Sequence, residues 1–382
     1  MAPTLSLTQL SYTSSGLLST PVDRLDGRDL LAFRPLKIVT GVADQAAGSA
    51  NCTLGDNTRC SLVISSEVVQ ESDEIESGLI QSYIDIHPAI PSSANLSALL
   101  VSLQKSLDQL FNPNASAIDT SQLIILRNPK APHRPTRAWK LIIDITLLDV
   151  SGGNVADVVF ATIYAALQDV QLPKTRAIGF DIQSMQAAQA NNGQGSQKVD
   201  IFDVRGSLTR TRGAGIPSSD ATRSSQTDDS PLLDAEQKAK VGVDFEIKDI
   251  YDGSNRLKGT RAFPIAITIN VLPNGILLDA TQTEEACIPY TRRVLILCDA
   301  LTGNVLGTQM LTASFETGSS RLGEERTKGG ASAAEQSILG TCDFATIKNA
   351  IKQGQIYAKA LHSAIEAQIG TKGEDDTQMA IE

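Results

Sequence analysis

The sequence has few aromatic residues, no excess of positive charge and no long apolar run. Only 4% of its 382 residues are aromatic, with a single Trp, whereas 41% are hydrophobic. That hydrophobic content excludes a wholly disordered chain, and the core must be built from Leu, Ile, Val and Ala. No apolar run approaches the roughly 18 residues that a membrane span requires, so no membrane contact is expected. At about 150 residues per domain, the length predicts two domains or two halves of one.

Positive charge is in deficit along the whole chain. Lys and Arg number 33 and Asp and Glu number 43, which gives a formal net charge of −10. A protein that binds nucleic acid on its own usually carries net positive charge, because it must replace the counterions on the phosphates. Any contact with RNA or DNA is therefore expected to be local or shared with a partner.

Neither the cysteines nor the common catalytic motifs indicate a disulfide framework, a metal site or an enzyme. The cysteines are five in number, widely spaced and without a C-x-x-C pair. This argues against a disulfide framework and a zinc site, and favours a reducing compartment. The sequence contains no P-loop, no G-x-G-x-x-G after a predicted strand, no H-E-x-x-H and no G-x-S-x-G. We therefore expect no metal and no cofactor, and these patterns do not indicate an enzyme.

The hydrophobic pattern predicts an α+β fold with two similar halves. In the first half, a helix over 155–170 is apolar on nearly every side, so it is expected in the interior, packed on a sheet. The other predicted elements of this half are strands within 36–69 around a turn at 55–57, an acidic solvated loop over 65–78, a strand over 79–86, a helix over 96–110, and a hairpin of 123–126 with 139–148.

The second half is predicted to contain two hairpins and a final helix, after a segment of different composition. Residues 184–238 are rich in Gln, Asn, Ser, Thr and Gly, and we expect them to be a disordered insertion. The hairpins are 263–271 with 276–278 and 294–298 with 305–311, and the helix is 344–369. The predicted organisation is an N-terminal segment 1–32, a first domain 33–180, a low-complexity insertion 181–242, a second domain 243–370 and an acidic tail 371–382.

Three stretches, taken in order, carry a resemblance to a known family. They are Arg24-Leu25-Asp26-Gly27-Arg28 followed by Phe33-Arg34-Pro35-Leu36, then Gly152-Gly153-Asn154-Val155-Ala156-Asp157, and then Asn274-Gly275-Ile276-Leu277-Leu278-Asp279-Ala280-Thr281. In this order and spacing the chain resembles the RNase PH-like subunits of the RNA exosome core, over about residues 10–180 and 243–370. The family motif residues are Arg24, Asp26, Gly27, Arg28, Gly152, Gly153, Asn154 and Asp279.

The resemblance implies a fold, an assembly and a location. The fold is RNase PH-like, with two pseudo-repeated β-α halves of the ribosomal protein S5 domain 2 type. The assembly is a hexameric ring of RNase PH-like subunits with S1/KH cap subunits, through which single-stranded RNA threads. The direct neighbour would be the mRNA-transport-regulator type of subunit. The implied process is 3′-to-5′ RNA processing and degradation, including rRNA maturation, in the nucleus, the nucleolus and the cytoplasm.

The same resemblance argues against catalysis by this chain. Active members of the family hold phosphate with a Gly-Ser-Arg turn, and Asn154 stands where that Arg would be. They also carry a second Asp about a dozen residues after the Leu-Asp motif, whereas no carboxylate lies between Glu285 and Asp299 here. The sequence therefore predicts a non-catalytic structural subunit. The alternatives are an active phosphate-dependent 3′-to-5′ exoribonuclease and a sister ring subunit with the same fold and a different neighbour.

The charged motif residues allow two interpretations each. Asp279, Glu284 and Glu285 are either a relict acidic site or groups that make hydrogen bonds at a hairpin end and are otherwise solvated. The second interpretation is favoured because no basic partner is evident in the sequence. Arg24 and Arg28 either bind phosphate or a partner, or pair with local carboxylates in a turn-rich segment, and the local pairing is favoured.

A basic loop offers the candidate RNA contacts. In related subunits an Asp-Arg-x-x-Arg pattern after the first helix supplies arginines for RNA, and both arginines are absent from Asp108–Asn112. Positive charge gathers instead between the arms of the first hairpin, where it could contact the phosphate backbone. A solvated hairpin loop is the favoured alternative. The candidate residues are Arg127, Lys130, Arg134 and Arg137.

Overall fold

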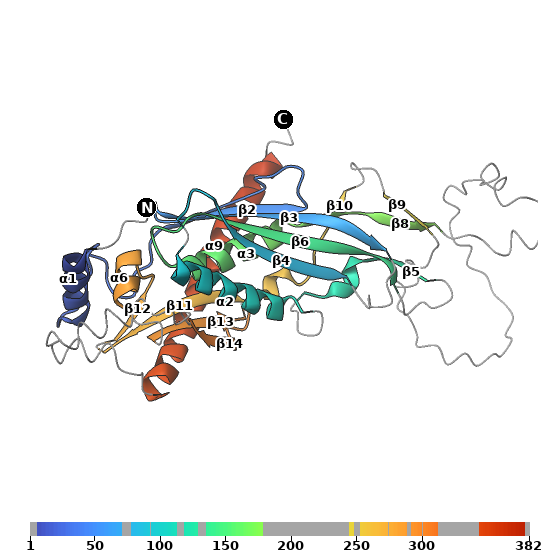
Figure 1. The fold of residues 1–382 in the computed structure, drawn as a ribbon. Coiled ribbons are helices and arrows are strands. Elements are labelled where there is room, and N and C mark those ends of the chain that lie inside the picture. The colour runs from blue at the N-terminus through green and yellow to red at the C-terminus, as the bar shows by residue number, and fades with distance from the viewer. Residues whose placement is uncertain are drawn as a thin grey trace, which may run out of the picture.

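The computed structural model describes residues 6–70, 78–91, 93–112, 118–128, 135–178, 244–247, 253–273, 275–288, 292–299, 301–311 and 344–378. Two antiparallel-rich sheets form layers on either side of a central helix (Figure 1). This arrangement confirms the predicted α+β class. In the described part of the chain, no helix has the length and apolar character needed to cross a membrane.

The first sheet contains six strands, five of which follow the order β1-β2-β3-β6-β4. The sixth, β5, pairs with β6 on the same side as β4. Neighbours are antiparallel, except that β4 runs parallel to β6. The predicted turn at 55–57 joins β2 and β3, with Gly55 at a φ of 58°. The strands are β1 (Leu36–Thr40), β2 (Gly48–Leu54), β3 (Thr58–Gln70), β4 (Leu79–Ile86), β5 (Ile124–Arg127) and β6 (Pro135–Asp149).

The central helix is α3 (Val155–Asp169), and every residue from Val155 to Leu167 is buried. It packs on β2 and β3 of the first sheet and on β11 of the second. Its all-round apolar sequence follows from this position, because both of its sides face protein. The prediction of an interior helix against a sheet is confirmed. A second helix, α2 (Ala94–Leu110), starts at the N-cap Ser93 and buries Leu103 and Leu107 on the same side of the first sheet.

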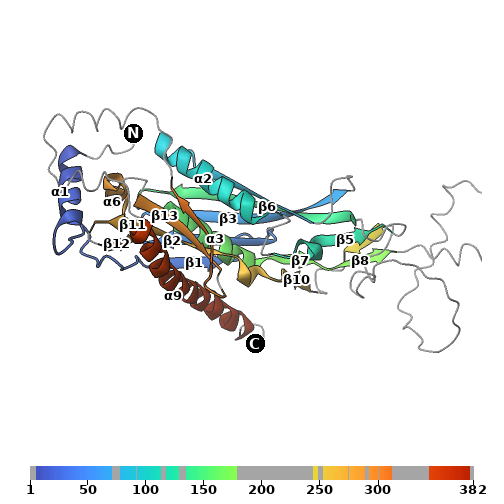
Figure 2. The ribbon, with the colours of Figure 1, turned by 90° about the horizontal axis from the view of Figure 1, so that it is seen from below.

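The second sheet has four antiparallel strands in the order β12-β11-β13-β14. Both predicted hairpins are confirmed by β11 with β12 and by β13 with β14. The last helix, α9 (Phe344–Gln378), packs on β11 and β13 and also reaches β1. Seen from below, α2 and α9 flank α3 on opposite sides (Figure 2). The strands are β11 (Ile265–Leu272), β12 (Gly275–Leu278), β13 (Arg293–Cys298) and β14 (Val305–Met310).

Short elements complete the two ends of the molecule. At one end, α1 (Leu7–Leu18) packs on α6 (Gln282–Cys287). At the other end, Ile178 pairs with Asp244, so the chain segments on either side of the predicted insertion lie side by side. The insertion itself, 181–242, lies outside the described residues. The remaining elements are the 3-10 turns η1 (Thr120–Leu123) and η4 (Thr260–Ala262) and the strand pairs β7 (Gln171–Pro173) with β10 (Ser254–Arg256) and β8 (Thr175–Ile178) with β9 (Asp244–Ile247).

Three expectations about these elements are wrong. The acidic loop predicted over 65–78 is strand as far as Gln70, because β3 pairs with β6 up to Arg137. The N-terminal segment contains the helix α1, where turns were expected. The helix α9 continues beyond 369 into the predicted acidic tail, as far as Gln378.

Candidate functional site

The three stretches that carry the family resemblance meet at one place between the two halves. The turn of Gly152 and Gly153 precedes α3, and Asp279 follows β12. A Cβ atom at Gly153 would lie 2.7 Å from the backbone nitrogen of Gln282, so only glycine allows this close approach of the two backbones. Arg34 donates from Nη1 to the carbonyl oxygen of Gly152 over 2.7 Å and ties the N-terminal stretch to the same turn.

Asp279 is the centre of this cluster, and its side chain has no exposed surface. Arg34 donates to Oδ2 from its backbone nitrogen over 2.7 Å and to Oδ1 from Nη2 over 2.6 Å. Arg28 donates from Nη1 to Oδ2 over 2.7 Å, and Asn154 donates from Nδ2 to Oδ1 over 3.1 Å. Burial alone raises the pKa of Asp279, but the hydrogen bonds and charge of Arg34 outweigh it and hold that pKa below its usual value.

A second buried ion pair lies beside the first. Arg24 and Glu284 form a bidentate pair with two N–O distances of 2.9 Å, and both side chains are almost fully buried. Arg24 also donates to the carbonyl oxygens of Leu278 and Asp279. The expectation that Asp279 and Glu284 lack basic partners and are mainly solvated is therefore wrong. Their partners lie about 250 residues away in the sequence, so no local pattern could have revealed them.

The N-terminus of α3 is surrounded by carboxylates of the chain itself. Asn154 has a φ of 55° and is almost fully buried. Its backbone nitrogen donates to Oε1 of Glu285 over 2.9 Å, and its Nδ2 also donates to Asp157 over 3.0 Å. Helix N-termini attract anions. Here the side chain of Glu285 already accepts from the backbone nitrogen of Asn154, so a free phosphate would have to displace a carboxylate of the chain itself.

The comparisons with known proteins agree with this geometry. Residues 32–173 match the model described as the 3′ exoribonuclease family, domain 1. The matched residues contain the first sheet, α2 and α3. The chain is 30% identical over 170 residues to the exosome complex component RRP42 of Saccharomyces cerevisiae, a match that covers 44% of this chain and 58% of that protein. It is 28% identical over 166 residues to the exosome complex component Rrp42 of Sulfurisphaera tokodaii, covering 42% and 56%.

The whole fold is shared with solved exosome cores. A chain of an archaeal exosome core aligns with a TM-score of 0.53 over 94% of this chain and 96% of that one, at 16% identity. The chain spans just over half the length of the curated relatives that it matches. The resemblance to RNase PH-like exosome subunits, stated above from three motifs, is confirmed by these matches.

Two of the candidate RNA contacts, Arg127 and Arg137, lie near β5, at the opposite end of the molecule from β12 and α6 (Figure 1). Arg127 is largely buried in β5. Arg137, in β6, forms an ion pair with Asp244 at 3.5 Å and lies over the ring of Phe245 at 5.3 Å. Lys130 and Arg134 lie outside the described residues. The structure therefore ties Arg137 to β9, and the RNA contacts stay a prediction.

Sequence reasoning missed Arg34 as a site residue and missed the helix that carries Glu284 and Glu285. A signal for that helix is present in the sequence. Thr281 accepts from the backbone nitrogen of Glu284 and its own backbone nitrogen donates to the Glu284 side chain over 2.8 Å, which is a capping box. The Thr-x-x-Glu pattern could have predicted the start of α6. No local signal marks Arg34, because its partner carboxylate is 245 residues away.

A pH test follows from Asp157, which accepts from Asn154 and from Thr268 Oγ1 at 2.7 Å. Burial raises the pKa of Asp157 from its ordinary value of 3.8 to about 7. The folded chain therefore holds a proton that the unfolded chain releases between about pH 4 and pH 7, so the free energy of unfolding should fall as the pH rises through that range. Asp157→Asn should flatten this slope in denaturant titrations at several pH values. Asp44→Asn, at an exposed carboxylate of the β1–β2 loop, should keep it, and an unchanged slope in the Asp157 variant would contradict the assignment.

Proposed function

We propose that the chain is a non-catalytic structural subunit of an RNA exosome core. The observation that carries the proposal is the buried cluster at the N-terminus of α3, where Asn154 contacts Glu285, Asp157 and Asp279. Phosphorolysis requires phosphate to be held by positive or amide groups beside the scissile bond. Here Arg28 and Arg34 are both paired with Asp279.

The names of the relatives support the assembly part of the proposal. Two curated relatives are exosome complex components of the Rrp42 type, and the aligned structure is an exosome core. The proposed role is to help form the ring of RNase PH-like subunits and its RNA channel, with the mRNA-transport-regulator type of subunit as direct neighbour and S1/KH subunits as cap. The proposed location is the nucleus and nucleolus, and also the cytoplasm. The net charge of −10 fits a subunit whose contact with RNA depends on its partners.

Two measurements on the full chain test this function. Incubation with single-stranded RNA, inorganic phosphate and magnesium should release no nucleoside diphosphates. The Asn154→Arg variant should also release none, because the new guanidinium would enter a buried site beside Asp157 and Asp279, whose carboxyl groups would compete with phosphate. Phosphate-dependent turnover that disappears in Asp279→Asn would instead establish the alternative, an active exoribonuclease.

The assembly is tested separately from the catalysis. Co-expression with an RNase PH-like subunit of the mRNA-transport-regulator type should give a stable 1:1 complex by light scattering. The tagged chain purified from its native source should bring other RNase PH-like subunits, identified by mass spectrometry. A chain that stays monomeric in both experiments would contradict the structural role, whatever its activity.

A further inference from the structure

The strand β4 lies at the edge of the first sheet. Among the described residues it forms a ladder only with β6. His87, directly after β4, donates from its backbone nitrogen to Leu147 of β6 over 2.9 Å. The backbone carbonyl of Ser82 accepts instead from the side chain of Gln104 in α2 over 2.7 Å. Since the N–H and C=O groups of one residue point to the same side of a strand, odd-numbered residues face β6 and even-numbered residues such as Ile84 face the open edge.

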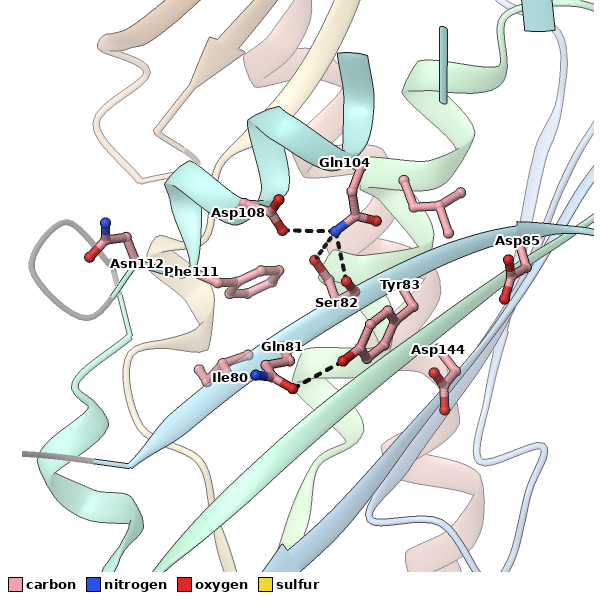
Figure 3. Close-up of a pocket in the computed structure, with 11 residues that line it drawn as sticks. Ile80, Gln81, Ser82, Tyr83, Asp85, Gln104, Asp108, Phe111, Asn112 and Asp144 are labelled. Atoms are coloured by element: carbon pink, nitrogen blue, oxygen red, sulfur yellow. Dashed lines mark hydrogen bonds between the residues drawn. The ribbon is translucent and has the colours of Figure 1, made fainter. Parts of the chain in front are cut away.

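A groove runs along this edge between β4 and α2 (Figure 3). Its volume is about 710 Å³. A smaller hollow of about 360 Å³ shares Ile84, Gln104 and Asp108 with it and continues along α2 to Val101. Val101 and Tyr83 are both well exposed, so the groove offers apolar and aromatic surface beside unpaired strand edge. Such an edge is a template for another strand.

The charge of the groove defines what fits it. Three carboxylates, Asp85, Asp108 and Asp144, line the larger groove, and none of the described Lys and Arg residues does so. Lys105 lines only the smaller hollow. A nucleic acid would bring phosphates against these carboxylates, which disfavours it. A peptide strand with basic side chains satisfies both the backbone edge and the charge.

We propose that the β4 edge and its groove bind an extended basic segment of a partner protein, which adds to the first sheet as a further strand. Backbone hydrogen bonds at the even-numbered residues of β4 hold the segment, and Asp85 and Asp144, which share the exposed face of the sheet, select Lys or Arg at alternate positions. Gln104 covers the Ser82 carbonyl in the free chain and is also bonded to Asp108 over 2.8 Å, so it moves aside on binding. This inference does not depend on the proposed ring function.

The test uses the full chain and synthetic peptides with blocked ends. The probe is a ten-residue peptide of alternating Val and Lys, labelled for fluorescence anisotropy. One matched control is the same peptide with N-methylated backbone at alternate residues, and the other replaces Lys with Glu. The Val–Lys peptide should bind. The N-methylated peptide should bind at least about tenfold more weakly because it loses several edge hydrogen bonds, and the Val–Glu peptide should not bind.

Variants of the chain separate the backbone contribution from the charge contribution. Ile84→Pro removes an outward N–H without removing a bond to β6 and should abolish binding. Asp85→Asn and Asp144→Asn should each weaken binding about 2- to 5-fold at low salt. Gln104→Ala frees the Ser82 carbonyl and should tighten binding by roughly 2-fold or more. Asp44→Asn, on the loop near the opposite edge strand β1, should change nothing.

Several outcomes would overturn the inference. Equal binding of the N-methylated and parent peptides would show a purely ionic contact. If Asp85→Asn and Asp144→Asn left the affinity for the Val–Lys peptide unchanged, the basis for a basic partner would be removed. Single-stranded RNA that competes for the groove, or self-association of the chain that Ile84→Pro abolishes while the peptide does not bind, would assign the edge to another occupant. If Ile84→Pro melts early, the N-methylated peptide and the two Asp variants decide the question.

Discussion

Replacing Asp279 with Asn should lower the free energy of unfolding by about 3–5 kcal/mol, the usual cost of removing one partner of a buried ion pair. Asn keeps the shape of the side chain and removes its charge. Arg28 and Arg34, whose side chains are only 17% and 13% exposed, would then lose the carboxylate that both contact. The loss should appear as a lower midpoint in urea titration and a lower melting temperature.

Asp26→Asn is the matched control for this prediction. Asp26 also pairs with Arg28, at 2.6 Å, but its side chain is 31% exposed. Solvent screens that pair, so the control should cost about 1 kcal/mol or less. Equal losses in the two variants would show that the cluster around Asp279 has no special role in holding the halves together.

The free energy of unfolding at acid pH tests the contribution of Asp279 independently. The pKa of Asp279 is below its usual value in the folded chain. The stabilisation from this carboxylate is therefore present above about pH 4 and is lost as the pH falls through the folded pKa. Its sign is opposite to that of Asp157, whose contribution falls between pH 4 and pH 7. Both carboxyl groups contact the side chain of Asn154, yet their pKa values shift in opposite directions. Asp279 has arginine partners, whereas Asp157 accepts hydrogen bonds only from neutral donors.

Much of the fold could be predicted because its signals are local. The helix α3 is apolar at nearly every position, and the hairpin of β11 and β12 turns at a Pro-Asn-Gly sequence. These features depend on residues within one element and its turn. The helices α1 and α6 are short and are fixed by capping boxes, from Ser6 with Gln9 and from Thr281 with Glu284, which a search for apolar periodicity does not detect.

Most residues of the candidate site could be predicted from the sequence, but their burial and their pairing could not. The three motif stretches contain Arg24, Arg28, Asn154 and Asp279, and all four lie in the cluster. That they are buried and paired depends on how the two halves dock, and the docking brings Arg24 to Glu284 across 260 residues. Sequence spacing carries no information about such a contact, so the carboxylates looked isolated when each was considered with its neighbours alone.

Gly153→Ala should be the most damaging small substitution at the contact between the halves. Gly153 has a φ of 78°, which costs an L-residue about 1–2 kcal/mol, and the new Cβ atom would lie 2.7 Å from the nitrogen of Gln282 and 2.9 Å from the carbonyl oxygen of Ala280. Both are backbone atoms that cannot rotate away, so overpacking adds about 1–3 kcal/mol.

Gly27→Ala isolates the conformational part of that cost. Gly27 has a φ of 69°, and a Cβ atom there would meet nothing within 4 Å. It should lose only the 1–2 kcal/mol of backbone strain, whereas Gly153→Ala should lose about 2–5 kcal/mol in all. Urea titration measures both values, and limited proteolysis should show faster cleavage around Ala280 in the Gly153 variant alone. Equal costs in the two variants would mean that the backbone of α3 and that of the segment before α6 are not held in contact, and the docking of the halves would have to rest on the ion pairs alone.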